Sequence, residues 1–324
     1  MVVSTCFCVN LLDTILSMRF QIRRSINNVY QARSLEDGRD YVCRIKGKVM
    51  KKEETEYSPV AVGDIAVGEP YSESEALLTG IEERRSAFTR WNIKRQLNQT
   101  IAANQDQTLI VTACSSPPFR PRFLDRAMAC SWGAELLIVM NKADEGLTEE
   151  AERFLSLYES LGISTLSASS KTGEGLDELL SQLKGKVTAF VGQSGVGKST
   201  LINTLLGTKQ RTGEISRKYN RGKHTTNHSL YIESEGFAVI DTPGVREIEV
   251  PFEDLSLVKE SFPEIRKLEC RYDSCLHRGE DGCLAPGLVE EGVIDPDRYE
   301  SYLRILDALE SRTPWYMRKG KGNA

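Results

Sequence analysis

The amino-terminal quarter of the chain has the short alternating rhythm of β-strands. From about Phe20 to Ala76, runs such as NVYQAR, DYVCRIKGKV and DIAVGE are separated by Gly, Pro and charged turns. Several short strands at this spacing predict a small closed barrel, and we expect one of the OB type. Within it, SPVAVGDIAVGE has Pro and Gly around an alternating apolar run, which predicts a strand pair at a barrel corner.

The rhythm then changes to alternating strands and helices. Residues 77–107 have the pattern of a connector, in which IKRQLNQTIAAN places apolar residues at helical spacing. After it, the runs TLIVT, AELLIVM, STLSAS and VTAFVG are typical of strands buried on both faces. Between them, LTEEAERFLSLYESLG and GLDELLSQLKG have helical periodicity, and Thr148 followed by Glu149 and Glu150 marks a helix start. This alternation predicts an α/β domain with a mainly parallel sheet.

From Pro251 onward the pattern loosens into a cluster of Cys and His residues and then an amphipathic helix, DPDRYESYLRILDALESR. Asp295 or Asp297 would cap this helix, with Pro296 in its first turn. Because 324 residues exceed what one core usually organises, we expect a multidomain α/β protein. The expected parts are an uncertain extension at 1–17, a barrel at 18–80, the α/β domain at 81–250 and a mainly helical domain at 251–324.

Composition adds a charge asymmetry to this picture. The hydrophobic content of 40% and charged content of 27% are those of an ordinary globular protein. The net charge is −4, yet the stretch from Arg19 to Lys52 holds ten Lys and Arg residues against three acidic ones. Such a stretch is more often a solvated face than a binding site, unless a nucleic-acid-binding fold accompanies it.

The cysteines and the first residues bear on the compartment. Of eight cysteines, five are scattered and only the last three cluster, which argues against a disulfide scaffold and for a reducing cytoplasm. The opening MVVSTCFCVNLLDTILS lacks a basic start, contains Asp13, and is too short and broken to span a membrane. Because Met18 is a plausible start, residues 1–17 are either an extension or an artefact of the assigned start.

The segment VTAFVGQSGVGKSTLINTLLG predicts a strand, a phosphate-binding loop and a helix, with G-x-x-x-x-G-K-S at Gly192–Ser199. Its glycines let the backbone N–H groups approach phosphates, and the following helix presents its positive end. Lys198 would meet the β- and γ-phosphates, and Ser199 would bind Mg²⁺. The alternative is a glycine-rich turn with a chance lysine. The nucleotide-contacting residues predicted here are Gly192, Gln193, Ser194, Gly195, Val196, Gly197, Lys198, Ser199 and Thr200.

A tetrapeptide at the end of a buried strand indicates which nucleotide base the site accepts. AELLIVMNKAD ends in N-K-x-D, formed by Asn141, Lys142, Ala143 and Asp144. The Asp144 carboxylate can accept hydrogen bonds from N1–H and the amine of guanine, whereas adenine offers no donors there. Asn141 would hold the loop, and the Lys142 stem would cover the ring. Downstream, the backbone of Ser167 and Ala168 would face guanine O6. These residues predict a GTP and GDP site.

A third motif completes a nucleotide switch. FAVIDTPG ends a strand in D-T-P-G, where Asp241 would hold Mg²⁺ through water and the Gly244 N–H would sense the γ-phosphate. In RGKHTTNH, either Thr225 or Thr226 could close over Mg²⁺, and the spacing to the next strand favours Thr225. Loss of the γ-phosphate would release both segments.

The motif order is a circular permutation, because N-K-x-D precedes the phosphate loop and D-T-P-G instead of following them. The D-T-P-G motif therefore leads straight into the carboxy-terminal domain. A movement at the nucleotide could thus pull directly on that domain.

The chain from about Met18 resembles the RsgA-type (YjeQ/EngC) circularly permuted GTPases of small ribosomal subunit biogenesis. The resemblance rests on SPVAVGD, IAANQDQ, NKAD, SAS, GQSGVGKS, GKHTT, DTPG and the metal cluster described below. It implies an OB-fold, a circularly permuted P-loop GTPase domain and a zinc-binding domain. It also implies binding to the immature small subunit and its ribosomal RNA, with release linked to GTP hydrolysis.

The catalytic group is not the one used by Ras-like enzymes. They orient the attacking water with a Gln after D-x-x-G, but Val245 stands there and cannot position water. His224 in GKHTT is the nearest candidate, as the resemblance also suggests. The alternative is a loop histidine without a catalytic role.

Three cysteines and one histidine lie within fourteen residues in LECRYDSCLHRGEDGC. Three thiolates and one imidazole form a closed tetrahedral set suited to one structural Zn²⁺. The spacing differs from that of a zinc finger but is the arrangement the family shows. The predicted ligands are Cys270, Cys275, His277 and Cys283.

The leading hypothesis is a GTP hydrolase that assists late maturation of the small ribosomal subunit. An OB-like barrel with local positive charge is a plausible RNA platform. The alternative is a nucleotide-gated binding module for translation factors or another RNA, whose hydrolysis is incidental. We expect a monomer in the reducing cytoplasm that the scattered cysteines indicate. We expect no membrane partner, because no segment could span a bilayer.

Overall fold

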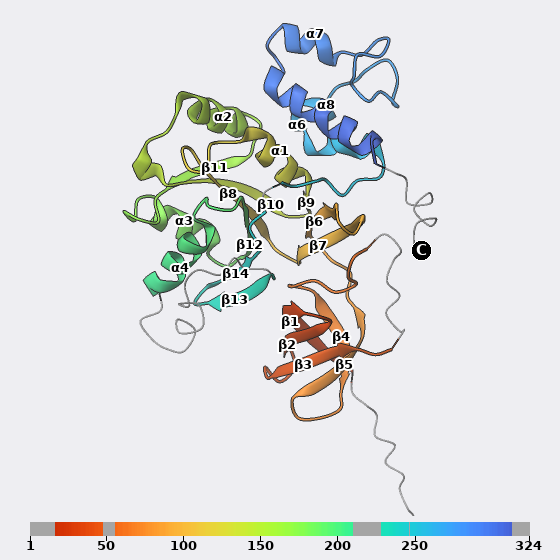
Figure 1. Ribbon diagram of the computed structural model, residues 1–324, viewed down its shortest axis with the longest axis vertical. Coiled ribbons are helices and arrows are strands. Elements are labelled where there is room, and N and C mark those ends of the chain that lie inside the picture. Colours follow the sequence, from red (N-terminus) through yellow and green to blue (C-terminus); the bar gives the residue numbers. More distant parts are fainter. Residues whose placement is uncertain (1–16, 48–55, 210–227, 246, 313–324) are drawn as a thin grey trace, which may run out of the picture.

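The computed structural model describes residues 17–47, 56–209, 228–245 and 247–312, and three parts of the chain are visible in it (Figure 1). A barrel lies at one end, an α/β domain lies in the middle, and a helical carboxy-terminal lobe, residues 251–312, lies at the other end. Among the described residues, no helix combines the length and apolar character needed to cross a bilayer.

The barrel is closed by five strands, as expected for an OB-type fold. Neighbouring strands follow the order β1-β2-β3-β5-β4, and β4 pairs again with β1 to close the ring. Alternate side chains point inward because successive residues of a strand face opposite sides, and they form a core around Phe20, Tyr30 and Leu78. The strands are β1 (Met18–Ile26), β2 (Val29–Ser34), β3 (Asp40–Ile45), β4 (Ile65–Pro70) and β5 (Glu75–Ile81).

The prediction of a strand pair in SPVAVGDIAVGE was wrong in its first half. Val60, Ala61 and Val62 are buried but belong to a turn, because the Asp64 carboxylate accepts the Ala61 N–H at 2.7 Å. Gly63 has a φ of +93°, and a Cβ there would lie 2.1 Å from the Ala103 carbonyl oxygen. The turn thus passes so close to the next sheet that only glycine fits.

The helical spacing in IKRQLNQTIAAN also misled, because the segment forms a turn and strand β7 (Leu97–Ala103). It pairs antiparallel with β6 (Ala87–Asn92), and β9 (Ser131–Trp132) completes a small three-stranded sheet. The Asn92 side chain accepts the Arg95 N–H at 3.1 Å, and Gln96 has a φ of +52°. This turn chemistry and the pairing with β6 override a weak helical periodicity.

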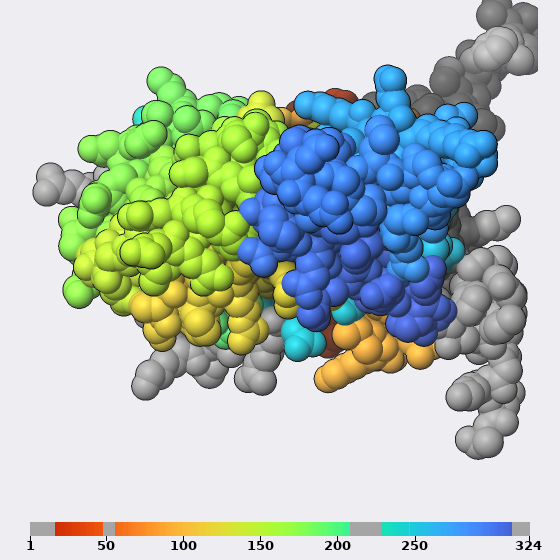
Figure 2. All heavy atoms as spheres, turned by 90° about the horizontal axis from the view of Figure 1, so that it is seen from above, coloured from red at the N-terminus to blue at the C-terminus, as the bar shows by residue number. Residues whose placement is uncertain are grey.

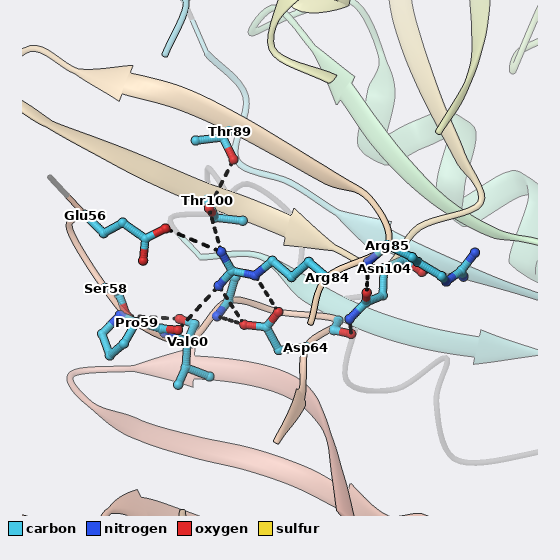
Figure 3. A network of polar contacts seen from close by, with 12 residues as sticks. Glu56, Ser58, Pro59, Val60, Asp64, Arg84, Arg85, Thr89, Thr100 and Asn104 are labelled. Carbon is cyan, nitrogen blue, oxygen red and sulfur yellow. Dashed lines mark hydrogen bonds and ion pairs between the residues drawn. The ribbon is translucent and has the colours of Figure 1, made fainter. Parts of the chain in front are cut away.

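One buried ion pair joins the barrel to this small sheet (Figure 3). The Arg84 guanidinium contacts both oxygens of the fully buried Asp64 carboxylate, at 2.8 and 2.9 Å. It also donates to the Thr100 hydroxyl of β7 at 3.2 Å and lies 3.6 Å from Glu56. Asp64 thereby fixes its own turn and the barrel's position against β7.

The central domain is a sheet covered by helices on both faces, as the alternating pattern predicts. Parallel neighbours run in the order β11-β10-β8-β12-β14, and the antiparallel β13 continues the sheet toward β1 of the barrel. The strands are β8 (Gln107–Ala113), β10 (Glu135–Asn141), β11 (Ser164–Ala168), β12 (Val187–Gly192), β13 (Leu230–Ser234) and β14 (Phe237–Asp241).

Strand β8 shows why two helical layers form. Leu109 and Val111 point into a core with helices α3 and α4, whereas Ile110 points into a core with α1 and α2. The helices are α1 (Pro121–Ala129), α2 (Glu149–Ser160), α3 (Leu176–Leu183) and α4 (Lys198–Lys209), with a short 3₁₀ turn η1 (Ala143–Glu145). The Thr148 hydroxyl accepts the Ala151 N–H at 3.2 Å, which confirms the predicted start of α2.

The carboxy-terminal lobe packs on α1 rather than forming a separate core. Its helices are η2 (Leu255–Ser261), α6 (Pro263–Arg266), α7 (Ala285–Glu290) and α8 (Pro296–Glu310). Asp295 caps α8 by accepting the N–H groups of Asp297 and Arg298, which decides between the two predicted caps. Apolar residues of α8, such as Tyr302 and Ile305, share the cluster that contains α1 and α2.

A fully buried arginine fastens this lobe to the central domain. Arg298 of α8 pairs with Asp125 of α1 at 2.5 Å and with Glu264 of α6 at 2.8 Å. The Tyr158 hydroxyl of α2 donates to the same Asp125 carboxylate at 2.7 Å. Burial alone lowers the pKa of Arg298, but Asp125 and Glu264 outweigh it and raise that pKa above its ordinary value. The ion pair therefore stays charged, and four elements depend on it.

We expect Arg298→Met to destabilise the protein by about 3 to 5 kcal/mol, since it leaves two buried carboxylates without their cation. The shift of the urea unfolding midpoint, followed by circular dichroism, measures this. Arg304→Met is the matched control on the same helix, because Arg304 forms an exposed pair with Glu300 and should cost less than about 1 kcal/mol. Equal stability of the two variants would contradict the role given to Arg298.

Candidate functional site

The three predicted nucleotide motifs meet at one edge of the central sheet. Strands β10, β8, β12 and β14 are parallel neighbours, so their carboxyl ends lie side by side. Asn141 ends β10, Gly192 ends β12 and Asp241 ends β14. Ligands of open α/β sheets bind at this edge. Segments that are far apart in the sequence thus form one candidate site.

The loop from Gly192 to Gly197 is shaped by its glycines. Gly195 and Gly197 have φ values of +92° and +86°, in the left-handed region that favours glycine. A Cβ on Gly192 would lie 2.7 Å from the Val111 carbonyl oxygen, and one on Gly197 would lie 2.4 Å from Asn141 Nδ2. Helix α4 begins directly afterwards at Lys198, so its positive end faces the loop. This geometry suits a bound anion.

Lys198 and Asp241 share a buried corner beside this loop. The Lys198 ammonium contacts the Asp241 carboxylate and lies 2.5 Å from the Thr242 carbonyl oxygen. Lys198 is 6% exposed and Asp241 is fully buried. The Thr242 hydroxyl in turn donates to the Phe190 carbonyl at 2.7 Å, which holds the start of D-T-P-G against β12. The cation predicted for phosphates and the carboxylate predicted for Mg²⁺ therefore lie together.

The buried amide of Asn141 links three loops. Its Nδ2 donates to the Val196 carbonyl of the phosphate loop at 2.8 Å. Its Oδ1 accepts from the Ser170 hydroxyl at 2.9 Å and from the Ser170 N–H at 3.3 Å. Asn141 is 2% exposed. Asn141 thus fixes the positions of the phosphate loop, the N-K-x-D loop and the segment after β11 relative to one another.

Asp144 is held ready in its ionised form. The Ser169 hydroxyl donates to its Oδ1 at 2.6 Å, and Lys171 lies 3.2 Å from its Oδ2. The Ser169 hydrogen bond, followed by Lys171, lowers the pKa of Asp144 below its usual value. An ionised carboxylate is the acceptor that the two donors of guanine require. Lys142 has a φ of +64°, and its ammonium group donates to the Ser116 carbonyl.

The structure describes most of the other predicted site residues, but not all of them. Gln193 and Val196 are buried in the phosphate loop, Ser194, Ser199 and Thr200 are exposed there, and Gly244 packs beside Ser194. Ser167 and Ala168 end β11 beside Met140 and Asn141, and Ala143 begins the 3₁₀ turn η1. His224 and Thr225 lie outside the described residues, so their predicted roles stay predictions.

Sequence reasoning missed the polar residues that position the motifs. Ser169, Ser170 and Lys171 hold Asn141 and Asp144, whereas only Ser167 and Ala168 of SASSKTG were predicted to belong to the site. The run of hydroxyl residues after a buried strand was an available signal, because Ser and Thr side chains commonly fix turns by bonding nearby backbone. The Thr242 carbonyl oxygen accepts from Lys198, and a backbone contact of this kind cannot be read from the sequence.

The predicted metal ligands form a single cluster in the carboxy-terminal lobe. The ligand atoms of Cys270, Cys275, His277 and Cys283 all lie within 4.8 Å of one another. Tetrahedral zinc thiolates place their sulfurs about 3.8 Å apart, so these residues fit such an ion. Burial, with Lys259 nearby, lowers the pKa of His277 and favours the neutral imidazole that ligates metals. The cluster can hold a metal ion.

The loops around the cluster are built to hold it. Backbone N–H groups of Leu284 and His277 donate to the sulfurs of Cys270 and Cys275, both at 3.4 Å. Burial raises the pKa of the Cys275 thiol to about 12 and outweighs the His277 hydrogen bond, which lowers that pKa, so a metal ion would have to displace the proton. Burial raises the pKa of Glu280, but its accepted N–H groups outweigh burial and lower it to about 2, so this carboxylate caps the loop. The hydroxyl of Tyr302 on α8 donates to the Leu276 carbonyl at 2.8 Å and anchors the loop to the helix.

Comparisons with known proteins point in one direction. A family model described as RsgA GTPase matches residues 81–251. A Borreliella burgdorferi (strain ZS7) protein, named small ribosomal subunit biogenesis GTPase RsgA, is 38% identical over 300 residues, covering 91% of this chain and 97% of that protein. Among solved structures, YjeQ from Thermotoga maritima is 26% identical with a TM-score of 0.68, covering 92% of this chain and 100% of that one. YloQ, described as a circularly permuted GTPase, is 24% identical with a TM-score of 0.65, covering 92% and 97%.

Replacement of Asn141 by Ala is expected to weaken guanine-nucleotide binding by about 10- to 100-fold. The change removes three hydrogen bonds and leaves buried partners unsatisfied, which costs about 1 to 3 kcal/mol. Titration with a fluorescent GDP analogue measures the affinity. Asn203→Ala is the matched control, because Asn203 is exposed on helix α4 and its replacement should change affinity less than about threefold. Unchanged binding in the Asn141 variant would refute its linking role.

Proposed function

The chain belongs to the RsgA GTPase family, and from this we propose that it is a nucleotide-gated factor that assists late maturation of the small ribosomal subunit. It is a GTP-hydrolysing enzyme. The observation that carries the proposal is the convergence of the three motifs on one sheet edge, with Asn141 bonded to two of the loops. In the proposed division of labour, 18–80 binds RNA, 81–250 hydrolyses GTP and 251–324 is held by zinc.

Each part of the nucleotide has a proposed set of residues. The N–H groups of the phosphate loop and Lys198 bind the phosphates, and Asp144 selects guanine by accepting from its two donors. Ser199 and Asp241 would hold Mg²⁺, which supplies neutralisation of phosphate charge when bound. The pairing of Lys198 with the buried Asp241 supports this arrangement, because both charges already face the same corner.

The attacking water needs an orienting group other than the residue after D-T-P-G. Val245 is 6% exposed, and its N–H donates to the Gly192 carbonyl at 3.2 Å, so neither its side chain nor its amide is available. We assign the role to His224 on the sequence argument alone. Thr225 is the proposed residue of the same segment for Mg²⁺.

Ribosomal RNA is the proposed partner of the barrel. The basic side chains Arg19, Arg44 and Lys46 form pairs with acidic neighbours, and the arginine side chains are 54% exposed. Exposed pairs of this kind are worth little and can exchange a carboxylate for a phosphate. Arg24 and Arg39 are exposed as well. The proposed contacts are therefore to phosphates and RNA shape rather than to base edges.

We propose that release is coupled to hydrolysis, and the permuted order of the motifs supports this. The segment after D-T-P-G crosses from the phosphate loop, where Val245 bridges to Gln193, to Glu249, which pairs with Arg126 of α1 and Arg312 of the lobe. A change at the γ-phosphate can thus reach the carboxy-terminal lobe through few residues. We propose a monomer that acts in the cytoplasm.

Purified small subunits should stimulate GTP turnover by the full chain by roughly tenfold or more, since the proposed catalytic arrangement is completed on the particle. Phosphate release with and without subunits measures this. The chain should co-sediment with subunits in a non-hydrolysable GTP analogue and dissociate in GDP. Turnover without stimulation would instead support a binding module whose hydrolysis is incidental.

His224→Ala should lower the stimulated rate by about 100-fold, the scale of a group that orients or deprotonates a nucleophile. Nucleotide affinity should stay within about threefold of the parent, because the phosphates and base are held elsewhere. His228→Ala is the matched histidine control. Equal stimulated turnover in the His224 variant and the parent would remove the assignment.

The full chain should contain one zinc ion, measured by elemental mass spectrometry, and Cys283→Ser should lose it. Metal loss should abolish hydrogen-exchange protection around 270–294, a region with little core of its own. Helix α8 should remain protected, because Tyr302 and Ile305 are buried against the central domain. Cys114→Ser, a buried cysteine outside the cluster, should keep the metal. A chelated protein with unchanged protection and subunit binding would rule out structural zinc.

A further inference from the structure

The carboxy-terminal lobe contains a segment whose charge is opposite to that of an RNA-binding surface. Residues 279–297, with the sequence GEDGCLAPGLVEEGVIDPD, hold six acidic residues and no Lys or Arg. The segment carries helix α7, which lies at the end of the molecule farthest from the barrel (Figure 1). Figure 2 looks down onto this end, where the lobe forms an outer face of the molecule.

Two large apolar side chains of this segment are exposed. Val293 is 67% exposed, more than any other large apolar residue among the described ones, and Leu284 is 47% exposed. Backbone bonds bring them together, since the Leu288 N–H donates to the Leu284 carbonyl and the Val293 N–H donates to the Leu288 carbonyl. Residues four apart lie on the same side of a helical turn. The bond from the Val293 N–H to the Leu288 carbonyl is the one that closes a Schellman motif at a helix end, where the residue after the glycine commonly lies over the last turn. These backbone bonds place Leu284, Leu288 and Val293 on successive turns of one short segment, here called the α7 patch.

The α7 patch is held rigidly from beneath. Ala285, which follows Leu284, is fully buried, and Ile294, which follows Val293, is 1% exposed, so the chain is anchored next to both outer patch residues. The Leu284 N–H donates to the sulfur of Cys270, which ties the patch to the metal cluster. A surface that is ordered before binding loses little conformational entropy when a partner docks. None of the three patch residues belongs to an apolar core of the described chain.

The charges beside the patch select the partner. Asp295 and Asp297 pair with Arg153, and Asp281 pairs with Arg271. Within the described residues, Glu290 and Glu291 at the end of α7 form no ion pair. Two carboxylates next to exposed apolar side chains repel phosphates and attract cations. They also disfavour a second copy of the same acidic surface.

We propose that the α7 patch docks a basic protein surface on the small-subunit particle, not its RNA. The inference rests on the proposed function, because it takes the particle as the source of the partner. The apolar side chains supply the buried contact, and the carboxylates of Glu290 and Glu291 pair with Lys or Arg of the partner. Interfaces of this kind combine an apolar centre with complementary charge at the rim.

The test uses the full chain with benzoylphenylalanine, a photo-crosslinking residue, in place of Val293. It is irradiated with purified small subunits and a non-hydrolysable GTP analogue, and the crosslinked species are identified by mass spectrometry. The same residue in place of Leu257, which is 46% exposed, is the matched control. We expect the Val293 position to crosslink to a basic protein component and the Leu257 position not to do so.

Charge reversal is an independent test, because it should change the affinity for subunits in opposite directions for a basic protein partner and for an RNA partner. The double change Glu290→Lys and Glu291→Lys should weaken subunit binding by roughly tenfold if the partner is basic protein, and should tighten it if the partner is RNA. Zinc content and melting temperature verify that the variant folds. Both residues are exposed and outside the metal ligands.

The outcomes separate this inference from the function on which it rests. A chain that does not sediment with subunits overturns the proposed function and this inference together. A chain that sediments, but crosslinks at position 293 to RNA, to a second copy or to nothing, overturns the inference alone. Tightened binding after charge reversal does so as well.

Discussion

One buried amide sets the geometry on which the nucleotide site depends. Asn141 uses its donor to hold the phosphate loop and its acceptor to hold the segment after β11, 55 and 29 residues away in the chain. A side chain with only a donor or only an acceptor could hold one of these loops but not both. Asp144 inherits its position from this link, because it follows three residues later and bonds to Ser169, next to the serine that Asn141 holds. The residues proposed to select the base and those proposed to bind phosphate are therefore joined through the Asn141 side chain.

The permuted order of the motifs connects these loops directly to the carboxy-terminal lobe. The strand that ends in Asp241 would, in the ordinary order, lead to further elements of the same domain, but here the chain leaves for the carboxy-terminal lobe. The lobe cannot drift freely, because Arg298 is buried between Asp125 and Glu264. Helix α1 thus receives the lobe at Asp125 and the segment after D-T-P-G at Arg126, on consecutive residues. A shift in either contact would move α1, so this helix could transmit a movement at the proposed nucleotide site to the lobe.

The parts predicted correctly from the sequence are those whose physics is local. Buried strands need apolar runs, and a phosphate loop needs glycines where φ is positive, as at Gly195 and Gly197. The failures have a different origin. The residues of strand β7 have helical spacing, but they form a strand because they pair with β6, which local periodicity does not reveal. The Arg84–Asp64 and Arg298–Asp125 pairs join residues 20 and 173 positions apart, and nothing in a single sequence marks such partners. Ser169 and Ser170 were missed for a third reason: hydroxyl residues are common in loops, and only their contacts in the structure show that these two position the site.

Charge is distributed along the molecule in a way that bears on how it would lie on a nucleoprotein particle. The barrel at one end carries exposed arginines in weak surface pairs, whereas the segment with α7 at the other end has six acidic residues and no basic one. A uniformly basic protein would adhere to RNA in many orientations, because phosphate attraction carries no direction. Under the proposed function, an acidic, apolar end would restrict the orientations, since the RNA backbone would attract the barrel and repel this end. A metal ion held by the cluster would fix that end, because residues 270–294 contribute little to the apolar cores and the Leu284 N–H already donates to the sulfur of Cys270.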